Sequence, residues 1–226
     1  LGQGHAYGAG AAVAAKFLKA RLGDVIDHTI YAYITDGGIQ EEISQGVGRI
    51  AGHLGLDNLI MFYDSNNIQL STTTNAVTSE DVAKKYEAWN WKVITIDGNN
   101  VDEIRRALNE AKAEKERPTL IIGNTVMGRG AVKADLTSFE HQISTHGQPL
   151  SAAGADFAQT VKNLGGDPED PFVIFPEVAE LYAKRREELK AIVAAKKAKH
   201  DEWAKNNPEL AEKKRKWFAR ELPEID

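Results

Sequence analysis

Two short apolar runs with a helical segment between them constrain this chain more than any other feature of its sequence. The runs, residues 29–34 and 58–63, are rich in β-branched and aromatic residues and carry no charge. Runs of this kind indicate buried strands of a parallel sheet. The segment between them, residues 41–54, carries an apolar stripe at helical spacing, which predicts a helix packed on that sheet. The stripe consists of Ile43, Val47, Ile50, Ala51 and Leu54.

Polar residues follow both runs at the points where the strands would end. Asp36, followed by two glycines, comes after the first run, and Asn66-Asn67 comes after the second. Ligands of open α/β sheets bind at the carboxyl ends of the strands, where a carboxylate and a carboxamide would suit a hard divalent cation that carries a phosphate. Taken alone, each residue is also explained by a helix cap or an ordinary turn. Their separation of 30 positions, one strand–helix–strand crossover, favours a joint site.

The rest of the first 125 residues continues the alternation of helices and strands. A small-residue helix is predicted over residues 5–21, and two further helices begin near Val82 and after the capping residue Asn100. Strands are predicted over residues 91–96 and 119–125. The predicted fold class is therefore α/β, a doubly wound, mostly parallel sheet with helices on both faces.

The pattern changes after residue 126, where a loop of roughly twenty residues leads to His146. A loop of this length inside a compact domain is usually functional or disordered. A helix is predicted over residues 151–164, and two highly charged helices follow at 177–204 and 208–222. We therefore expect two parts, a ligand-binding domain over residues 1–175 and a helical extension over residues 176–226.

Composition excludes several classes of protein. The chain has no cysteine, which rules out disulfides, thiolate metal sites and a cysteine nucleophile. Its net charge of −5 gives no nucleic-acid footprint, and no apolar run reaches the roughly 20 residues that span a bilayer. We expect no nucleic-acid or membrane partner and a cytoplasmic location. Because the chain begins at Leu1 in a glycine-rich loop, we also expect it to be a piece of a longer protein.

The Asp36-Gly37 and Asn66-Asn67 pairs resemble the thiamine-diphosphate motif, a GDG followed after 25 to 30 residues by NN or a close variant. The flanking residues are similar to those of the transketolase family, and the resemblance covers essentially the whole chain. It implies the N-terminal, diphosphate-binding domain of a transketolase, present here as a fragment. The flanking matches include Gln40-Glu41, Ile43-Ser44, Leu54-Gly55-Leu56, Tyr63-Asp64, Glu80-Asp81-Val82-Ala83-Lys84, Arg117-Pro118-Thr119-Leu120, His146-Gly147 and Pro149-Leu150.

The resemblance implies a role for each matched residue. The metal ligands would be Asp36, Asn66 and the backbone carbonyl of Ile68, with Mg²⁺ or Ca²⁺ held against the diphosphate of thiamine diphosphate. The N–H of Gly37 and the side chain of His146 would contact that diphosphate. Three further roles follow from the same resemblance: apolar contact with the thiazolium for Leu1 and Met127, proton transfer or binding of the donor's hydroxyl for His146, and a catalytic link across a dimer interface for Glu41.

The implied reaction transfers a two-carbon glycolaldehyde unit from a ketose phosphate to an aldose phosphate, as in the pentose phosphate pathway. The implied partners are sugar phosphates, the second protomer of a homodimer and a pyrimidine-binding domain, in the same or a separate chain. Since that domain lies outside these residues, we expect the isolated chain to be inactive. Two residues depart from the family pattern, Thr35 and Glu42, which stand where glycine is usual.

Three alternatives compete with this assignment. A deoxyxylulose-phosphate synthase or a 2-oxo-acid dehydrogenase subunit would use the same cofactor, but the His146–Leu150 segment and the tail around Trp203 argue against both. A non-catalytic binding or regulatory module could keep the fold, and both Thr35 and the missing pyrimidine-binding domain would support it. A nicotinamide-binding domain is excluded because no G-x-G-x-x-G follows a predicted strand.

Overall fold

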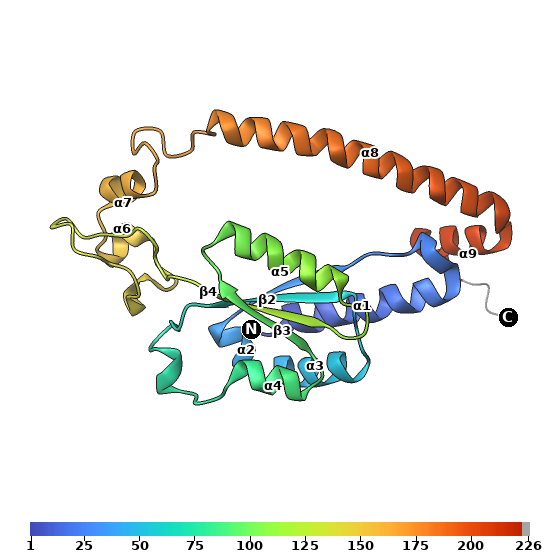
Figure 1. Ribbon diagram of the computed structural model, residues 1–226, viewed down its shortest axis with the longest axis horizontal. Helices are drawn as coiled ribbons and strands as arrows, with labels where there is room; N and C mark the ends of the chain where they lie inside the picture. Colours follow the sequence, from blue (N-terminus) through green and yellow to red (C-terminus); the bar gives the residue numbers. More distant parts are fainter. Residues whose placement is uncertain (223–226) are drawn as a thin grey trace. The chain divides into compact units, whose positions relative to one another are not determined.

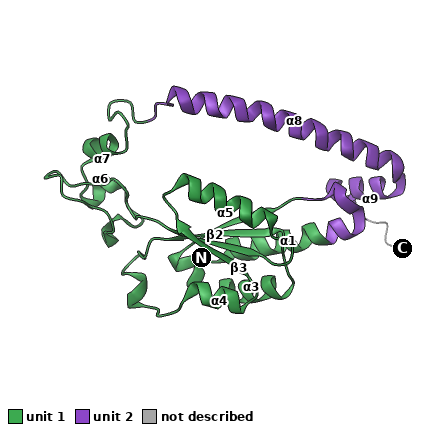
Figure 2. Cartoon of the chain, viewed as in Figure 1, with its two compact units in different colours: residues 1–16, 28–171 green, residues 17–27, 172–226 purple. Residues whose placement is uncertain are grey.

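A computed structural model describes residues 1–222 (Figure 1). The chain divides into two compact units (Figure 2). The first combines residues 1–16 with residues 28–171, and the second combines residues 17–27 with the chain from residue 172 onward.

The first unit is built on four parallel strands. These are β1 (Ile30–Thr35), β2 (Leu59–Ser65), β3 (Lys92–Asp97) and β4 (Thr119–Asn124), hydrogen-bonded in the order β1-β2-β4-β3. Each strand lies within two residues of its predicted bounds. The register pairs Ile34 with Tyr63 and Asp64 with Gly123, so β1, β2 and β4 end level with one another at one edge of the sheet.

Helices cover both faces of the sheet (Figure 1). Helices α1 (Gln3–Leu22), α3 (Glu42–His53) and α4 (Val82–Ala88) contribute to one core, and α5 (Val101–Ala113) packs over the other face. The alternation along β2 supplies both cores, because Leu59, Met61 and Tyr63 enter the first core and Ile60 and Phe62 enter the second. The predicted α/β class with helices on both faces is confirmed.

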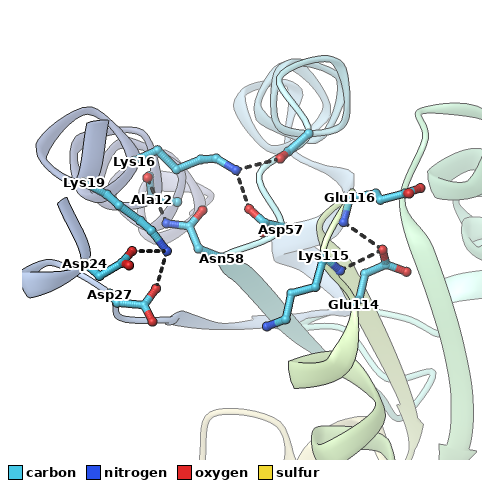
Figure 3. A network of polar contacts seen from close by, with 11 residues as sticks. Ala12, Lys16, Lys19, Asp24, Asp27, Asp57, Asn58, Glu114, Lys115 and Glu116 are labelled. Carbon is cyan, nitrogen blue, oxygen red and sulfur yellow. Dashed lines mark hydrogen bonds and ion pairs between the residues drawn. The ribbon is translucent and has the colours of Figure 1, made fainter. Parts of the chain in front are cut away.

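Polar contacts hold the start of β2 to α1 (Figure 3). Lys16 forms an ion pair with Asp57, and the side chain of Asn58 donates to the carbonyl of Ala12 at 3.0 Å. These contacts lie at the amino ends of the strands, opposite the edge of the sheet where Asp36 and Asn66 stand.

Helix α3 packs on the sheet through a different face from the predicted one. Its buried residues are Ser44, Gly48, Ala51 and Gly52, and the predicted inward residues Ile43, Ile50 and Leu54 are exposed. Only Ala51, which is buried, and Val47, which packs against the core, agree with the prediction. That part of the prediction is therefore wrong.

The reason is the bulk of the aromatic residues that face α3. A Cβ on Gly48 would lie 2.9 Å from the ring of Trp89, and one on Gly52 would overlap the Trp89 carbonyl oxygen. The indole N–H of Trp91 donates to the carbonyl of Gly48 at 2.7 Å. Since Tyr86, Trp89 and Trp91 fill the space above the sheet, only a helix face of small residues can approach it.

The loop after β4 is packed in the structure. Ala131, Phe139 and Ala155 form a small core of their own. The single helix predicted over residues 151–164 is two short helices, α6 (Leu150–Ala153) and α7 (Phe157–Asn163). They are separated at Gly154, whose φ of 108° is a left-handed conformation that ends α6.

The second unit contains two consecutive helices. Helix α8 (Pro176–Asn206) and helix α9 (Pro208–Ala219) each begin with a proline in the first turn, where its missing N–H costs nothing. Arg220, with a φ of 58°, ends α9 three residues before the predicted end at residue 222. Within this unit Lys199 donates to the carbonyl of Asp24 at 3.0 Å, and Lys19 contacts Asp24 and Asp27 (Figure 3). None of the described helices is long and apolar enough to span a bilayer.

Candidate active site at the carboxyl edge of the sheet

Asp36 stands at the end of β1 and begins the short helix α2 (Asp36–Gln40). Its side chain is buried, with 1% of the residue exposed. Its Oδ1 accepts a hydrogen bond from the Tyr63 hydroxyl at 2.6 Å, and its Oδ2 accepts from the backbone N–H groups of Asn66 and Asn67 at 3.0 and 3.1 Å. Asp36 thus ties the end of β1 to the loop that follows β2, as the predicted joint site requires.

Thr35 precedes this carboxylate without strain. Its φ is −119°, in the extended region, so the turn does not need the glycine that is usual in the family motif. The departure at Thr35 therefore leaves the position of Asp36 intact.

Tyr63 is a site residue that the sequence did not single out. Burial raises its pKa, and its hydrogen bond to Asp36 raises the pKa further. The phenol therefore stays protonated and donates to the carboxylate at any physiological pH. Its alternation with Leu59 and Met61 along β2 predicts that Tyr63 is a core residue. The alternation does not predict the hydrogen bond from its hydroxyl to Asp36.

Asn66 and Ile68 belong to a fixed turn beyond β2. Both are largely buried, and Asn66 Oδ1 accepts a hydrogen bond from the N–H of Ile68 at 3.0 Å. Asn67 has a φ of 63°, which asparagine tolerates, and its carbonyl accepts from the N–H of Thr74 at 3.1 Å. Hydrogen bonds thus bring together Asp36, Asn66 and Ile68, the three predicted metal ligands.

Leu1, Gly37 and Glu41 meet where the start of the chain packs on α2 and α3. A Cβ on Gly37 would lie 3.7 Å from Leu1 Cδ1, which places this leucine over the predicted diphosphate donor. A Cβ on Gly2 would lie 2.5 Å from Ile43 Cγ2 and 3.1 Å from Glu41 Cβ, so glycine is required there for close packing. Glu41 itself forms the junction between α2 and α3.

His5 supports this junction and was also missed by sequence reasoning. It is buried, with 3% of the residue exposed, and its Nδ1 lies 2.6 Å from Ser44 Oγ. Burial lowers the pKa of His5 to about 4, so the imidazole is neutral at pH 7. Its Nε2 is buried and has no hydrogen-bond partner among the described residues. The two residues are 39 positions apart, and no local pattern connects them.

Met127 and His146 both lie in the segment beyond β4. Thr125 N–H donates to the Ser65 carbonyl at 3.0 Å, which joins the start of this loop to the end of β2. A Cβ on Gly128 would lie 3.6 Å from Thr145 Cγ2, so Met127 and His146 flank a contact between their neighbours. The Nδ1 of His146 is buried without a partner, and in the described residues no hydrogen bond joins His146 to Asp36.

A cavity of about 270 Å³ lies between α2, the loop beyond β2 and the start of α4. Its walls include Gln40, Tyr63 and Asn67, but none of the predicted metal or diphosphate ligands lines it. Among the described residues, no three His, Asp or Glu side chains converge as a metal site of their own.

Asp36, Asn66, the carbonyl of Ile68 and His146 together fit a diphosphate with its metal better than either group alone. One carboxylate, one carboxamide and a carbonyl are hard oxygen donors, and they leave positions on the cation that diphosphate oxygens could fill. The unpaired Nδ1 of His146 and the glycines around Asp36 suit a close approach by a phosphate. Because the predicted ligands include no lysine or arginine, a metal and backbone N–H groups would have to offset the diphosphate charge.

The chain is similar to known proteins over its full length. The family described as transketolase, thiamine diphosphate binding domain, matches residues 1–223. The chain is 35% identical to a transketolase of Streptococcus pyogenes over 100% of its own length and 31% of that protein. It is 36% identical to a transketolase of Geobacillus stearothermophilus over 99% of its own length and 33% of that protein. The chain therefore spans about a third of the length of these relatives.

Solved structures give the same result. A transketolase from Leishmania mexicana superimposes with a TM-score of 0.85 at 30% identity, over 92% of this chain and 31% of that one. A transketolase from Pichia stipitis in complex with sedoheptulose 7-phosphate superimposes with a TM-score of 0.88 at 29% identity, over 99% of this chain and 33% of that one. With its parallel sheet, its Asp36–Asn66 edge and these relatives, the chain belongs to the family of transketolase thiamine-diphosphate-binding domains.

Proposed function

We propose that this chain is the diphosphate- and metal-binding part of a transketolase, a transferase that moves a two-carbon unit from a ketose phosphate to an aldose phosphate. The observation that carries the proposal is the Asp36 cluster, in which one buried carboxylate joins the ends of two neighbouring parallel strands. Membership of the family supports it. In this assignment residues 1–175 form the binding domain, and residues 176–226 lead towards a pyrimidine-binding domain in the same or a separate chain.

The metal would be Mg²⁺ or Ca²⁺, held by Asp36, Asn66 and the carbonyl of Ile68. Two features of the chain prepare these ligands. The Tyr63 hydroxyl occupies one lone pair of Asp36 Oδ1 and fixes the orientation of the carboxylate, leaving a second lone pair for the metal. The hydrogen bond from Ile68 N–H likewise fixes the Asn66 carboxamide.

The diphosphate would accept hydrogen bonds from the N–H of Gly37 and from His146. Leu1 and Met127 would pack against the thiazolium and keep water from it. Bound thiamine diphosphate supplies the stabilised carbanion that no protein side chain can supply. His146, with one buried and unpaired ring nitrogen, would bind the donor's hydroxyl or move a proton there.

The proposed partners are sugar phosphates and a second protomer. Structures of the Pichia stipitis relative hold sedoheptulose 7-phosphate and xylulose 5-phosphate, which supports sugar phosphates as substrates here. Glu41, at the junction of α2 and α3, would link the two active sites of a homodimer. We assign the reaction to the pentose phosphate pathway and to the cytoplasm.

The test is calorimetric titration of thiamine diphosphate, with and without Mg²⁺, into a protein that contains this chain together with a pyrimidine-binding domain. We expect metal-dependent binding that the Asn66→Ala substitution weakens by about tenfold or more. This variant keeps the backbone N–H groups that bind Asp36. The matched control is Asn109→Ala, an exposed asparagine on α5. Binding without metal, or equal loss in both variants, would contradict the proposed site.

A further inference from the structure

The second unit contains an apolar groove between the end of α1 and α9. The groove has a volume of about 290 Å³, and its walls are Phe17, Leu18, Trp217 and Phe218. All four residues belong to the second unit (Figure 2). Phe17 and Phe218 are 52% and 66% exposed. Single exposed apolar residues are ordinary, but exposed aromatic rings that converge on one hollow indicate a binding surface.

Two cationic side chains lie against rings of this groove. Arg21 is one turn beyond Phe17 on α1, and its Cζ is 4.2 Å from the centre of the Phe17 ring. Lys214 is one turn before Phe218 on α9, and its Nζ is 5.6 Å from the centre of the Phe218 ring. Because a cation is attracted to the face of an aromatic ring, both charges are held at the edge of the groove.

No negative charge neutralises these two cations. In the part of the chain that the structure describes, neither Arg21 nor Lys214 forms an ion pair with an acidic side chain. The Nζ of Lys214 lies 2.5 Å from His200 Nε2, a contact that brings no counter-ion. Burial lowers the pKa of Lys214, as it does for an amine without a carboxylate beside it.

The acidic residues closest to these cations in the sequence already have other partners. Asp24 lies 3.6 Å from Lys19, and Glu212 lies 2.7 Å from Arg215. Helix α9 carries four cationic and two acidic side chains, although the whole chain has a net charge of −5. The groove therefore combines apolar walls with positive charge that this unit leaves unbalanced.

We propose that this groove binds a small amphipathic anion, a carboxylate with a short aliphatic chain. The chain would pack against the aromatic walls, and the carboxylate would supply the counter-ion that Arg21 and Lys214 lack. A groove of this size is at the lower limit for small-molecule sites, so it suits a short chain better than a long lipid. The site shares no residue with the predicted ligands of thiamine diphosphate, so either assignment can fail without the other.

The first experiment titrates octanoate into this chain and follows the indole N–H signal of Trp217 by NMR. We expect saturable binding with a dissociation constant of about 1 mM or below. 1-Octanol, which has the same aliphatic chain and no charge, should bind at least fivefold more weakly. A signal that does not saturate, or equal affinities for the two compounds, would overturn the proposal.

Substitution of a wall residue tests the place of binding. Phe17→Ala should weaken octanoate binding at least fivefold, because it removes one side of the groove. The matched control is Phe157→Ala on α7, which removes a phenylalanine of the same exposure, 51%, and should leave binding unchanged. Circular dichroism checks that both variants keep their helices. Equal effects of the two substitutions would place octanoate elsewhere and contradict the proposed groove.

Substitution of the cations then tests the charge without disturbing the walls. Arg21→Gln and Lys214→Gln should each weaken octanoate binding by about three- to tenfold and leave 1-octanol unchanged, and high salt should have the same effect. The control is Lys133→Gln, because Lys133 also lies over an aromatic ring, that of Phe139, but outside the groove. If the variants weaken both compounds alike, the two cations do not bind the carboxylate and the proposal fails. Titration of thiamine diphosphate with Mg²⁺ into the same variants tests the proposed function separately.

Discussion

Tyr63→Phe removes one oxygen atom from the centre of the candidate site and leaves its shape unchanged. In the native chain this oxygen donates a 2.6 Å hydrogen bond to Asp36 Oδ1, and both residues are almost completely buried. The substitution leaves Asp36 with its two backbone N–H donors on Oδ2 and with no protein donor on Oδ1. The main effect is therefore the loss of one hydrogen bond to a buried charge.

The expected loss of stability follows from that contact. A hydrogen bond to a charged group contributes about 1.5–3 kcal/mol, and a buried oxygen left without its donor lies towards the upper end of this range. We expect the free energy of unfolding to fall by about 2 kcal/mol. With an m-value of about 3 kcal/mol/M in urea, the midpoint of unfolding falls by roughly 0.7 M. Tryptophan fluorescence is a suitable probe because Trp89 and Trp91 belong to the same core as Tyr63.

Tyr86→Phe is the matched control. Tyr86 is as deeply buried as Tyr63, but its hydroxyl has no hydrogen-bond partner among the described residues. Removing it should change the free energy of unfolding by less than about 0.5 kcal/mol or raise it slightly, since an unsatisfied buried hydroxyl is unfavourable. Equal losses for the two variants, or no loss for Tyr63→Phe, would refute the argument that this hydroxyl stabilises the Asp36 cluster.

Three further predictions concern other parts of the first unit. The pKa of His5 is lowered by burial from 6.5 to about 4, so the unfolded chain binds more protons between these values, and stability should fall by up to about 3 kcal/mol as the pH drops through this window. Urea unfolding at pH 7, 6 and 5 should show this slope, and His5→Leu should flatten it; an unchanged slope would exclude His5 as its source. Gly52→Ala should destabilise the chain by about 3 kcal/mol because its methyl group would overlap the Trp89 carbonyl. Gly10→Ala, in the open part of α1, should stabilise the chain by up to about 1 kcal/mol. Thermal unfolding measures both, and equal shifts of the melting temperature in the two variants would contradict the packing argument. The isolated chain should show no turnover in a coupled transketolase assay, and normal turnover would show that no pyrimidine-binding domain is needed.

The strands and the edge of the sheet could be predicted because their signals are local. Each strand is a short run made mostly of apolar residues, and the two site residues stand directly after β1 and β2. Once the strands are parallel neighbours, their ends must meet, so the closeness of Asp36 and Asn66 follows from the order of the elements. The motif spacing therefore contained the main geometry of the candidate site.

The face of α3 and the role of Tyr63 could not be predicted because both depend on distant partners. Apolar periodicity predicts that α3 packs on the sheet through its largest apolar residues. Trp89, from a later segment, occupies the space between α3 and the sheet, so only the small residues of α3 fit there. The stripe of Ile43, Ile50 and Leu54 was read correctly as apolar and assigned to the wrong side. Gly154 was read as part of one helix, although its left-handed backbone separates α6 from α7. Similarly, no spacing rule connects His5 to Ser44.

The three hydrogen bonds to the Asp36 carboxylate affect how relatives of this chain should be compared. A side chain that holds two strand ends together is needed for folding whether or not a cofactor binds. A descendant that lost thiamine diphosphate would still be under selection to keep this aspartate, so its presence in a sequence is weak evidence for activity. Among the described residues, the Asn66 carboxamide makes one local hydrogen bond and the His146 ring nitrogen Nδ1 makes none. After loss of the cofactor, Asn66 and His146 would be substituted before Asp36. They are therefore the better markers of family members that still bind the cofactor.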